Sequence, residues 1–184
     1  MAYLKSLPVK AHIADVFQNF SKGVPELLEF HDLYLRSESV LSVGEREMIA
    51  AFVSALNGCQ FCFGSHSRIA ALYNIQPSLF LELITDIETS KVDEKFKPIL
   101  RYVKKLTLTP SKITQVDIDQ ILNQGWSEEA VHTSATICAL FNFMNRLVDG
   151  LGVSEESIAS KSLQGNGHLS KTSYKDFGRA AGII

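Results

Sequence analysis

Residues 57–66 read NGCQFCFGSH and lie between two segments that carry the apolar period of an α-helix. Asn57 and Gly58 tolerate left-handed backbone conformations, so they end one helix and turn the chain. A second helix then begins at or near Cys59 and runs to about Tyr73. The sequence therefore predicts two helices that fold back on each other, with two cysteines at the start of the second.

The rest of the chain has the same helical period, and no run alternates convincingly with the period of two of a β-strand. We expect further helices at about 10–21, from Pro25 through Leu35, from the capping box Ser42–Glu45 through Leu56, at about 77–88, 93–107, 114–123 and 127–147, and beginning at Ser154. Residues 127–147 are apolar over much of the helix circumference, which is typical of a central or interface helix. We predict an all-α protein.

The length, composition and net charge of the chain limit the classes of protein to which it can belong. The chain has 184 residues, 46% of them hydrophobic and 21% charged, with a net charge of −2. We expect a single domain over 1–184, with 163–184 as a C-terminal arm. Nucleic acid is not an expected partner because there is no basic excess. The chain shows neither a signal peptide nor a membrane-spanning run of roughly 18 apolar residues, so we expect a cytoplasmic protein without a membrane partner.

The chain has three cysteines, an odd and small number that does not make a structural disulfide framework. Two of them, Cys59 and Cys62, are close enough in sequence to act together in redox chemistry. On one helix, Cys59, Cys62 and His66 fall within an arc of roughly 60°. The Cβ atoms of i and i+3 neighbours lie about 5–6 Å apart, close enough for a disulfide after small adjustment. The N-terminal end of a helix stabilises a thiolate, and the His66 imidazole can accept its proton. The segment therefore predicts a thiol-redox centre.

Glu47 is the candidate partner of this imidazole. It lies on the preceding helix, twelve residues before Cys59, so its carboxylate can polarise His66 directly or through a water. Zinc is the serious rival reading, because Cys59, Cys62 and His66 are plausible ligands and Glu47 could be a fourth.

Four further residues lie in the most apolar predicted helix. Cys138 is most simply a small core residue. Asn142, Asn145 and Arg146 are polar, and we interpret them as residues that cap, pair or line a subunit contact rather than as catalytic groups.

The pattern Glu47–x11–Cys59–x2–Cys62–x3–His66 resembles that of the alkylhydroperoxidase D family, part of the carboxymuconolactone decarboxylase superfamily. The resemblance covers about residues 20–180 and is most specific in this spacing. It is carried by Leu41–Glu47, Asn57–His66 and, for the subgroup of uncharacterised peroxidase-related enzymes, by Gly125–Ser127, Phe141–Leu147 and Gly150–Gly152.

The resemblance implies a helical bundle that assembles as a trimer or hexamer and reduces a hydroperoxide. By position, Cys62 would attack the peroxide through a sulfenic acid and Cys59 would resolve it as a disulfide. His66 would relay protons, and Glu47 would support His66. The reductant would be a dithiol, a thioredoxin-like protein or a lipoyl group. This chemistry needs neither a metal nor an organic cofactor.

The resemblance leaves alternatives open. Better-studied members carry a second histidine directly before the second cysteine, where this chain has Phe61, so efficient peroxidase activity does not follow. The residues alone favour Cys59 as the more dipole-stabilised thiolate, whereas the family pattern assigns the attack to Cys62. A disulfide oxidoreductase without peroxidase activity and a redox sensor are the main alternatives. A lactone decarboxylase, an activity whose enzymes generally lack the CxxC pair, and a zinc-binding protein are the others.

Overall fold

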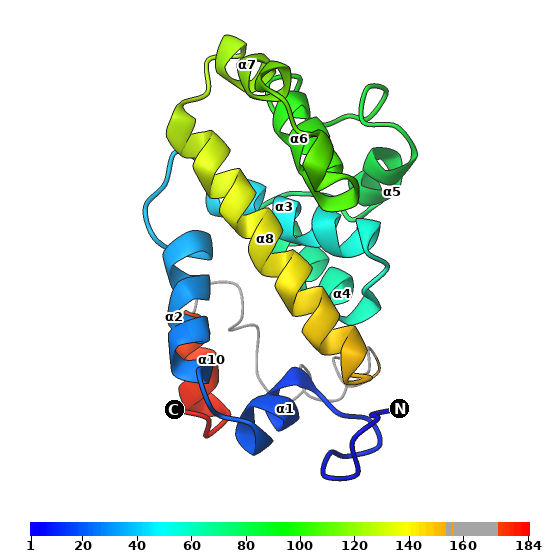
Figure 1. Cartoon of the computed structure of the whole chain (residues 1–184), viewed down its shortest axis with the longest axis vertical. Coiled ribbons are helices and arrows are strands. Elements are labelled where there is room, and N and C mark those ends of the chain that lie inside the picture. Colours follow the sequence, from blue (N-terminus) through cyan, green and yellow to red (C-terminus); the bar gives the residue numbers. More distant parts are fainter. Residues whose placement is uncertain (154–155, 157–172) are drawn as a thin grey trace. The chain divides into compact units, whose positions relative to one another are not determined.

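The computed structural model describes residues 1–153, 156 and 173–184. Within them the chain forms nine α-helices, one short 3₁₀ helix and no strand (Figure 1), so the all-α prediction is confirmed. The helices are α1 (Ile13–Asn19), α2 (Val24–Leu35), α3 (Val43–Leu56), α4 (Gln60–Ala71), α5 (Ser78–Thr85), α6 (Lys97–Leu108), η1 (Pro110–Lys112), α7 (Gln115–Asn123), α8 (Glu128–Gly150) and α10 (Tyr174–Ala180). The helix expected from Ser154 falls outside the described residues.

The chain divides into two compact units, one made of residues 1–37 with 146–184 and the other of residues 38–145. In the first unit, the Asp32 carboxylate of α2 accepts hydrogen bonds from the backbone N–H groups of Tyr174 and Lys175 at the start of α10. Gly178 lies so close to α2 that a Cβ would be 2.6 Å from Leu28 Cδ1. The end of the expected C-terminal arm is therefore a helix held against its own chain, too short for its period to stand out in the sequence.

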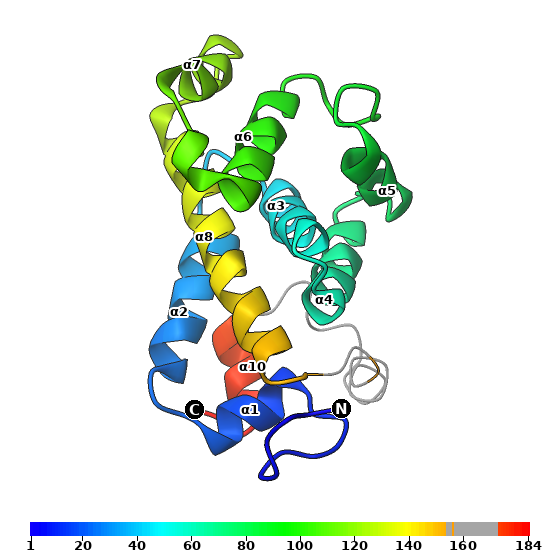
Figure 2. The same ribbon diagram turned by 45° about the vertical axis from the view of Figure 1, so that its right-hand side comes forward.

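Helix α3 is the centre of the second unit, and every residue from Arg46 to Ser54 is buried. It contacts α4, α5 and α6, and Asn145 of α8 donates a hydrogen bond to Ser54 near its C-terminal end. Figure 2 shows α3 enclosed by these helices. Because α3 has no solvent-facing side along this stretch, any charge it carries there needs an internal partner.

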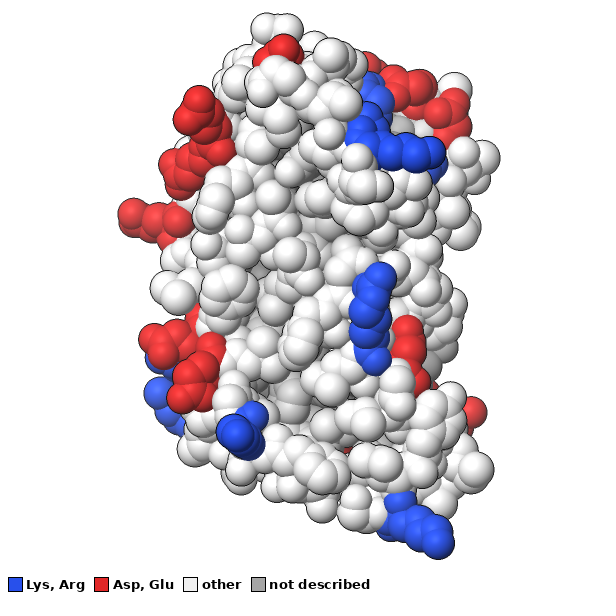
Figure 3. All heavy atoms as spheres, viewed as in Figure 1, with Lys and Arg blue, Asp and Glu red and all other residues white. Residues whose placement is uncertain are grey.

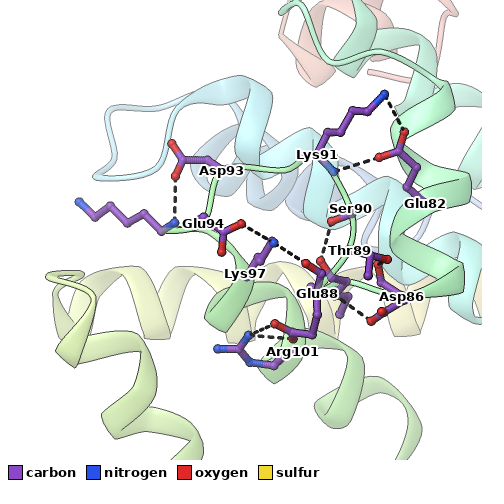
Figure 4. Close-up of polar contacts among 12 residues, drawn as sticks. Glu82, Asp86, Glu88, Thr89, Ser90, Lys91, Asp93, Glu94, Lys97 and Arg101 are labelled. Atoms are coloured by element: carbon purple, nitrogen blue, oxygen red, sulfur yellow. Dashed lines mark hydrogen bonds and ion pairs between the residues drawn. The ribbon is translucent and has the colours of Figure 1, made fainter.

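The loop between α5 and α6 is fixed by polar contacts (Figure 4). Lys97 is only 4% exposed, and its ammonium donates to the Glu88 carbonyl at 2.6 Å. Arg101 pairs with the Glu88 carboxylate at 2.9 and 3.1 Å. This loop uses residues that we expected at the start of a helix over 93–107; α6 instead begins at Lys97, with Pro98 in its first turn.

The middle of α8 presents an uncharged face to solvent. Its outward positions include His132, Ala139 and Phe143, the last 52% exposed. In Figure 3 the surface over the middle of this helix is white, with charged side chains gathered toward its ends and on neighbouring elements. Across the described part of the chain, no helix combines the length and apolar character needed to cross a membrane.

Replacing Gly44 by alanine should destabilise the second unit. An ideal Cβ at this position would lie 2.9 Å from Tyr73 Cβ and 3.3 Å from Ile75 Cδ1, and overpacking of this kind costs about 1–3 kcal/mol. Gly150→Ala is the matched control, because Gly150 is also helical and a Cβ there meets nothing within 4 Å. Urea unfolding should show a lower midpoint for Gly44→Ala and an equal or higher one for Gly150→Ala. Equal stability of the two variants would contradict the close packing of α3.

Candidate functional site

The turn between α3 and α4 is held by backbone hydrogen bonds on both sides of Cys59. Gly58 has φ +74°, the left-handed conformation that commonly ends a helix. The N–H of Cys59 donates to the Ser54 carbonyl at 2.9 Å, and that of Gly58 to the Ala55 carbonyl at 3.1 Å, which together form a Schellman motif. The Cys59 carbonyl accepts from the Phe63 N–H at 2.9 Å and so begins α4. One residue therefore both completes the end of α3 and caps the start of α4.

Cys59 is the N-cap of α4, with φ −76° and ψ 96°, and Cys62 is the third residue of the helix. The same two positions of α3 hold Ser42 and Glu45, whose side chains meet at 2.7 Å in a capping box. The N-cap and third positions thus direct their side chains toward each other. In α4 these two positions hold Cys59 and Cys62, so both thiols lie in the first turn at the N-terminal end of the helix.

Glu47 and His66 form a buried pair between α3 and α4. The Glu47 side chain is 0% and the His66 side chain 10% exposed, and Glu47 Oε2 lies 2.7 Å from His66 Nδ1. Because a carboxylate accepts hydrogen bonds, the contact assigns the proton to Nδ1 and leaves Nε2 as the nitrogen that can exchange a proton. The Phe141 ring of α8 meets the imidazole edge-on, with ring centroids 4.4 Å apart. The contact is the direct one of the two arrangements that we expected.

All four predicted site residues lie on the α3–α4 pair. His66 follows Cys62 by one helical turn, so both occupy one face of α4. Cys59 is 0% and Cys62 3% exposed. A molecule that reacts with either sulfur must therefore be small, or the first turn of α4 must open locally to admit it.

An amide cluster beside the turn includes residues that we did not place in the site. Asn57 Nδ2 donates to Asn145 Oδ1 at 2.9 Å and to Asn142 Oδ1 at 3.2 Å. Asn145 Nδ2 donates to Ser54 Oγ at 3.0 Å. We expected Asn142 and Asn145 to cap, pair or line a subunit contact; both pair with Asn57, a partner that the packing of α8 decides. In the sequence, the presence of two asparagines in the most apolar predicted helix was the only sign of this amide cluster.

Cys138 is a buried core residue, as expected, and is 1% exposed. Its sulfur lies 3.3 Å from Thr107 Oγ1 and 3.5 Å from Asn142 Nδ2. Burial raises the pKa of this thiol above its usual value, and the hydrogen bonds with Thr107 and Asn142 only partly oppose that effect. Cys138 is thus kept as a neutral thiol at ordinary pH.

The hypothesis of a zinc site requires several ligand side chains directed at one metal position. Within residues 1–153, 156 and 173–184, no group of three or more His, Cys, Asp or Glu side chains is arranged to hold a metal ion.

The fold and this site describe an all-helical protein with a dithiol at a helix N-terminus and a buried carboxylate–imidazole pair beside it. Residues 24–73, which include all four predicted site residues, match the model of the carboxymuconolactone decarboxylase family. No curated protein gives a significant match to the sequence.

Solved structures share the fold at low sequence identity. An uncharacterized peroxidase-related protein from Silicibacter sp. TM1040 has a TM-score of 0.70 and 22% identity, over 76% of this chain and 73% of that one. An alkylhydroperoxidase D core protein from Ralstonia eutropha JMP134, also described as an uncharacterized peroxidase-related protein, has a TM-score of 0.68 and 22% identity, over 73% and 71%. A debrominase in complex with 2,3,4-tribromopyrrole has a TM-score of 0.67 and 16% identity, over 82% and 80%.

Residues 24–73 thus carry the similarity to the carboxymuconolactone decarboxylase family, and the solved structures share the fold of this chain.

Cys138 should react with iodoacetamide more slowly than Cys62 in the folded protein. A rise of one pKa unit lowers the thiolate fraction about tenfold at neutral pH, and burial raises the pKa of Cys138. Peptide mass spectrometry after timed alkylation at pH 7.5 measures both rates in one sample, and unfolding in urea should make them similar. Equal rates in the folded protein would show that Cys138 is not protected.

Proposed function

We propose that this protein is a thiol-dependent peroxidase in which Cys59 and Cys62 alternate between dithiol and disulfide. The observation that carries the proposal is the placement of both cysteines at the N-terminus of α4, one helical turn before an imidazole that a buried carboxylate holds. This combination provides an activated sulfur nucleophile, a second sulfur within reach, and a group to move protons.

In the first step, the Cys62 thiolate attacks the terminal oxygen of a hydroperoxide. The S–O bond forms as the O–O bond breaks, giving a sulfenic acid and an alkoxide that takes a proton from His66. The Cys59 thiol then attacks the Cys62 sulfur, and water leaves as the disulfide forms. An external dithiol returns two electrons by thiol–disulfide exchange.

We assign the attack on the peroxide to Cys62 because it shares a helix face with His66, whereas Cys59 lies on the turn before the helix. Glu47 stabilises the protonated imidazole and fixes its orientation, as carboxylates do when paired with a catalytic histidine.

The burial of both sulfurs favours a small oxidant over a protein disulfide. A hydroperoxide is far smaller than a protein partner, so it needs less opening of the first turn of α4 to reach Cys62. The reductant, a small dithiol, a lipoyl group or a thioredoxin-like protein, would act on the oxidised form.

Phe61 leaves the site with one imidazole. It is buried, 7% exposed, at the second residue of α4, where the resemblance implied a second histidine. Proton transfer therefore depends on His66, and the proposed enzyme should be slower than one with two histidines.

A second candidate uses the same dithiol on a different electron acceptor. The debrominase of similar fold is a complex with a brominated pyrrole, and Phe141 supplies an aromatic ring next to His66 in this chain. Reductive debromination would replace a C–Br bond by C–H, oxidise the two thiols to a disulfide and release HBr. Activity assays with tribromopyrrole in place of peroxide, on wild type and on the Cys62→Ser and Cys138→Ala variants introduced below, distinguish the two functions.

Assembly into a trimer or hexamer is part of the proposal. The uncharged face of α8, with Phe143 52% exposed, is a surface that a second copy could cover.

The peroxidase proposal predicts that Cys62→Ser abolishes dithiol-driven peroxide consumption, because the nucleophile is lost. Cys138→Ala is the matched control and should retain the wild-type rate, since Cys138 lies apart from the proposed cycle. The measurement is peroxide loss with dihydrolipoamide or dithiothreitol as reductant. Equal rates for wild type and Cys62→Ser would remove Cys62 from the mechanism. Disulfide formation on a single exposure to peroxide, without turnover by any dithiol, would favour a redox sensor.

Glu47→Gln should lower the rate of peroxide consumption about a hundredfold, within the range of general acid–base contributions. Glutamine preserves the size of the side chain but not its charge, so the protonated imidazole loses its compensating carboxylate. His66→Gln should have a similar effect, and the double variant should be no slower than either single variant, because the two residues act as one unit. Additive losses, measured as kcat/KM at a temperature where all variants are folded, would show that the two residues act separately.

A further inference from the structure

We propose that Asn145 is a positioning residue that sets the dithiol–disulfide equilibrium of Cys59 and Cys62 by clamping the turn from which Cys59 projects. This inference deepens the proposed function, but it requires only that the two cysteines form a reversible disulfide.

The Asn145 side chain bonds two points of the same turn. Its Nδ2 donates to Ser54 Oγ at 3.0 Å, and its Oδ1 accepts from Asn57 Nδ2 at 2.9 Å. Ser54 and Asn57 are the first and fourth residues of the six-residue Schellman turn that ends at Cys59, and the Ser54 carbonyl accepts the N–H of Cys59. One amide thus spans the segment whose geometry places the first sulfur.

The clamp is buried and both ends of its amide are paired. Asn145 is 2% exposed and Ser54 0%, and Ser54 Oγ also donates to the Ala50 carbonyl at 2.8 Å. Buried polar groups that are fully bonded favour one arrangement strongly over its alternatives, because any other leaves a donor or acceptor unpaired. Asn142 supplies a second acceptor for Asn57 at 3.2 Å, and Asn145 reaches both Asn57 and Ser54.

Disulfide stability depends on how often the two sulfurs meet. Cys59 is the N-cap and Cys62 the third residue of α4, so the two are i and i+3 neighbours whose Cβ atoms lie about 5–6 Å apart on a helix. A fixed turn therefore gives the Cys59 sulfur a high effective concentration toward Cys62. Loosening the turn lowers that concentration, so the disulfide becomes easier to reduce.

The clamp acts on one cysteine more than on the other. Both bonds of Asn145 reach residues that precede Cys59, whereas Cys62 and His66 are placed by α4 itself and by the contact of His66 with Glu47. Loss of Asn145 should therefore change disulfide closure without changing the first reaction of Cys62.

The test is the equilibrium of the folded protein with mixtures of reduced and oxidised dithiothreitol, read by alkylation and mass spectrometry. For Asn145→Ala we expect the equilibrium constant for disulfide formation to fall about tenfold, which corresponds to a potential about 30 mV less negative. Ser134→Ala is the matched control. It removes a buried hydroxyl of α8 that donates to the Ala130 carbonyl at 2.7 Å, away from the turn, so its constant should stay within about twofold of wild type.

A second measurement separates positioning from general damage. Two proteins are compared, Cys59→Ser and the double variant Cys59→Ser/Asn145→Ala. Peroxide should convert Cys62 to a sulfenic acid at the same rate in both. If Asn145→Ala does not fold, Ser54→Ala breaks one of the same bonds from α3 and should lower the constant in the same direction.

Three outcomes would overturn the inference: an unchanged constant in Asn145→Ala and Ser54→Ala, an equal fall in Ser134→Ala, or a matching loss in the rate of Cys62 oxidation. A wild-type protein that forms no reversible disulfide would overturn the peroxidase proposal as well. A wild-type protein that cycles normally while the variants show no shift would overturn the role of Asn145 alone.

Discussion

The second unit depends on one buried contact, the pair formed by Glu47 and His66. A carboxylate with no exposed surface, in the middle of a helix that is buried all round, carries a large desolvation cost unless a partner compensates it. His66 lies nineteen residues later along the chain. It can reach Glu47 only if α4 folds back along α3, so the pair ties the local chemistry to the arrangement of the two helices.

The turn that permits this folding also positions the thiols. Gly58 supplies the left-handed residue, the Schellman bonds fix the N–H of Cys59, and its carbonyl begins α4. The chain thus changes direction at the residue whose side chain is proposed to close a disulfide. Because Cys59 serves both helices, any movement of the end of α3 is transmitted directly to the sulfur.

Helix α8 completes the surroundings through three kinds of contact. Phe141 covers the imidazole edge, Asn145 and Asn142 bond the turn, and Cys138 fills core space next to Thr107. The same helix thus excludes water from the buried pair and supplies polar partners where the turn needs them. Its apolar composition alone does not distinguish these roles, because each depends on which side of the helix faces α3.

The sequence by itself determined the helical class, most helix positions, and the grouping of Glu47, Cys59, Cys62 and His66, because helical periods, caps and i, i+3 and i, i+4 spacings are local properties. It did not predict α10, whose seven residues are held by Asp32 from far along the chain. Nor did it choose between a direct and a water-mediated Glu47–His66 contact, or connect Asn145 to Ser54. Only the tertiary structure decided these, since each is a contact between distant segments whose distance and orientation are set by packing.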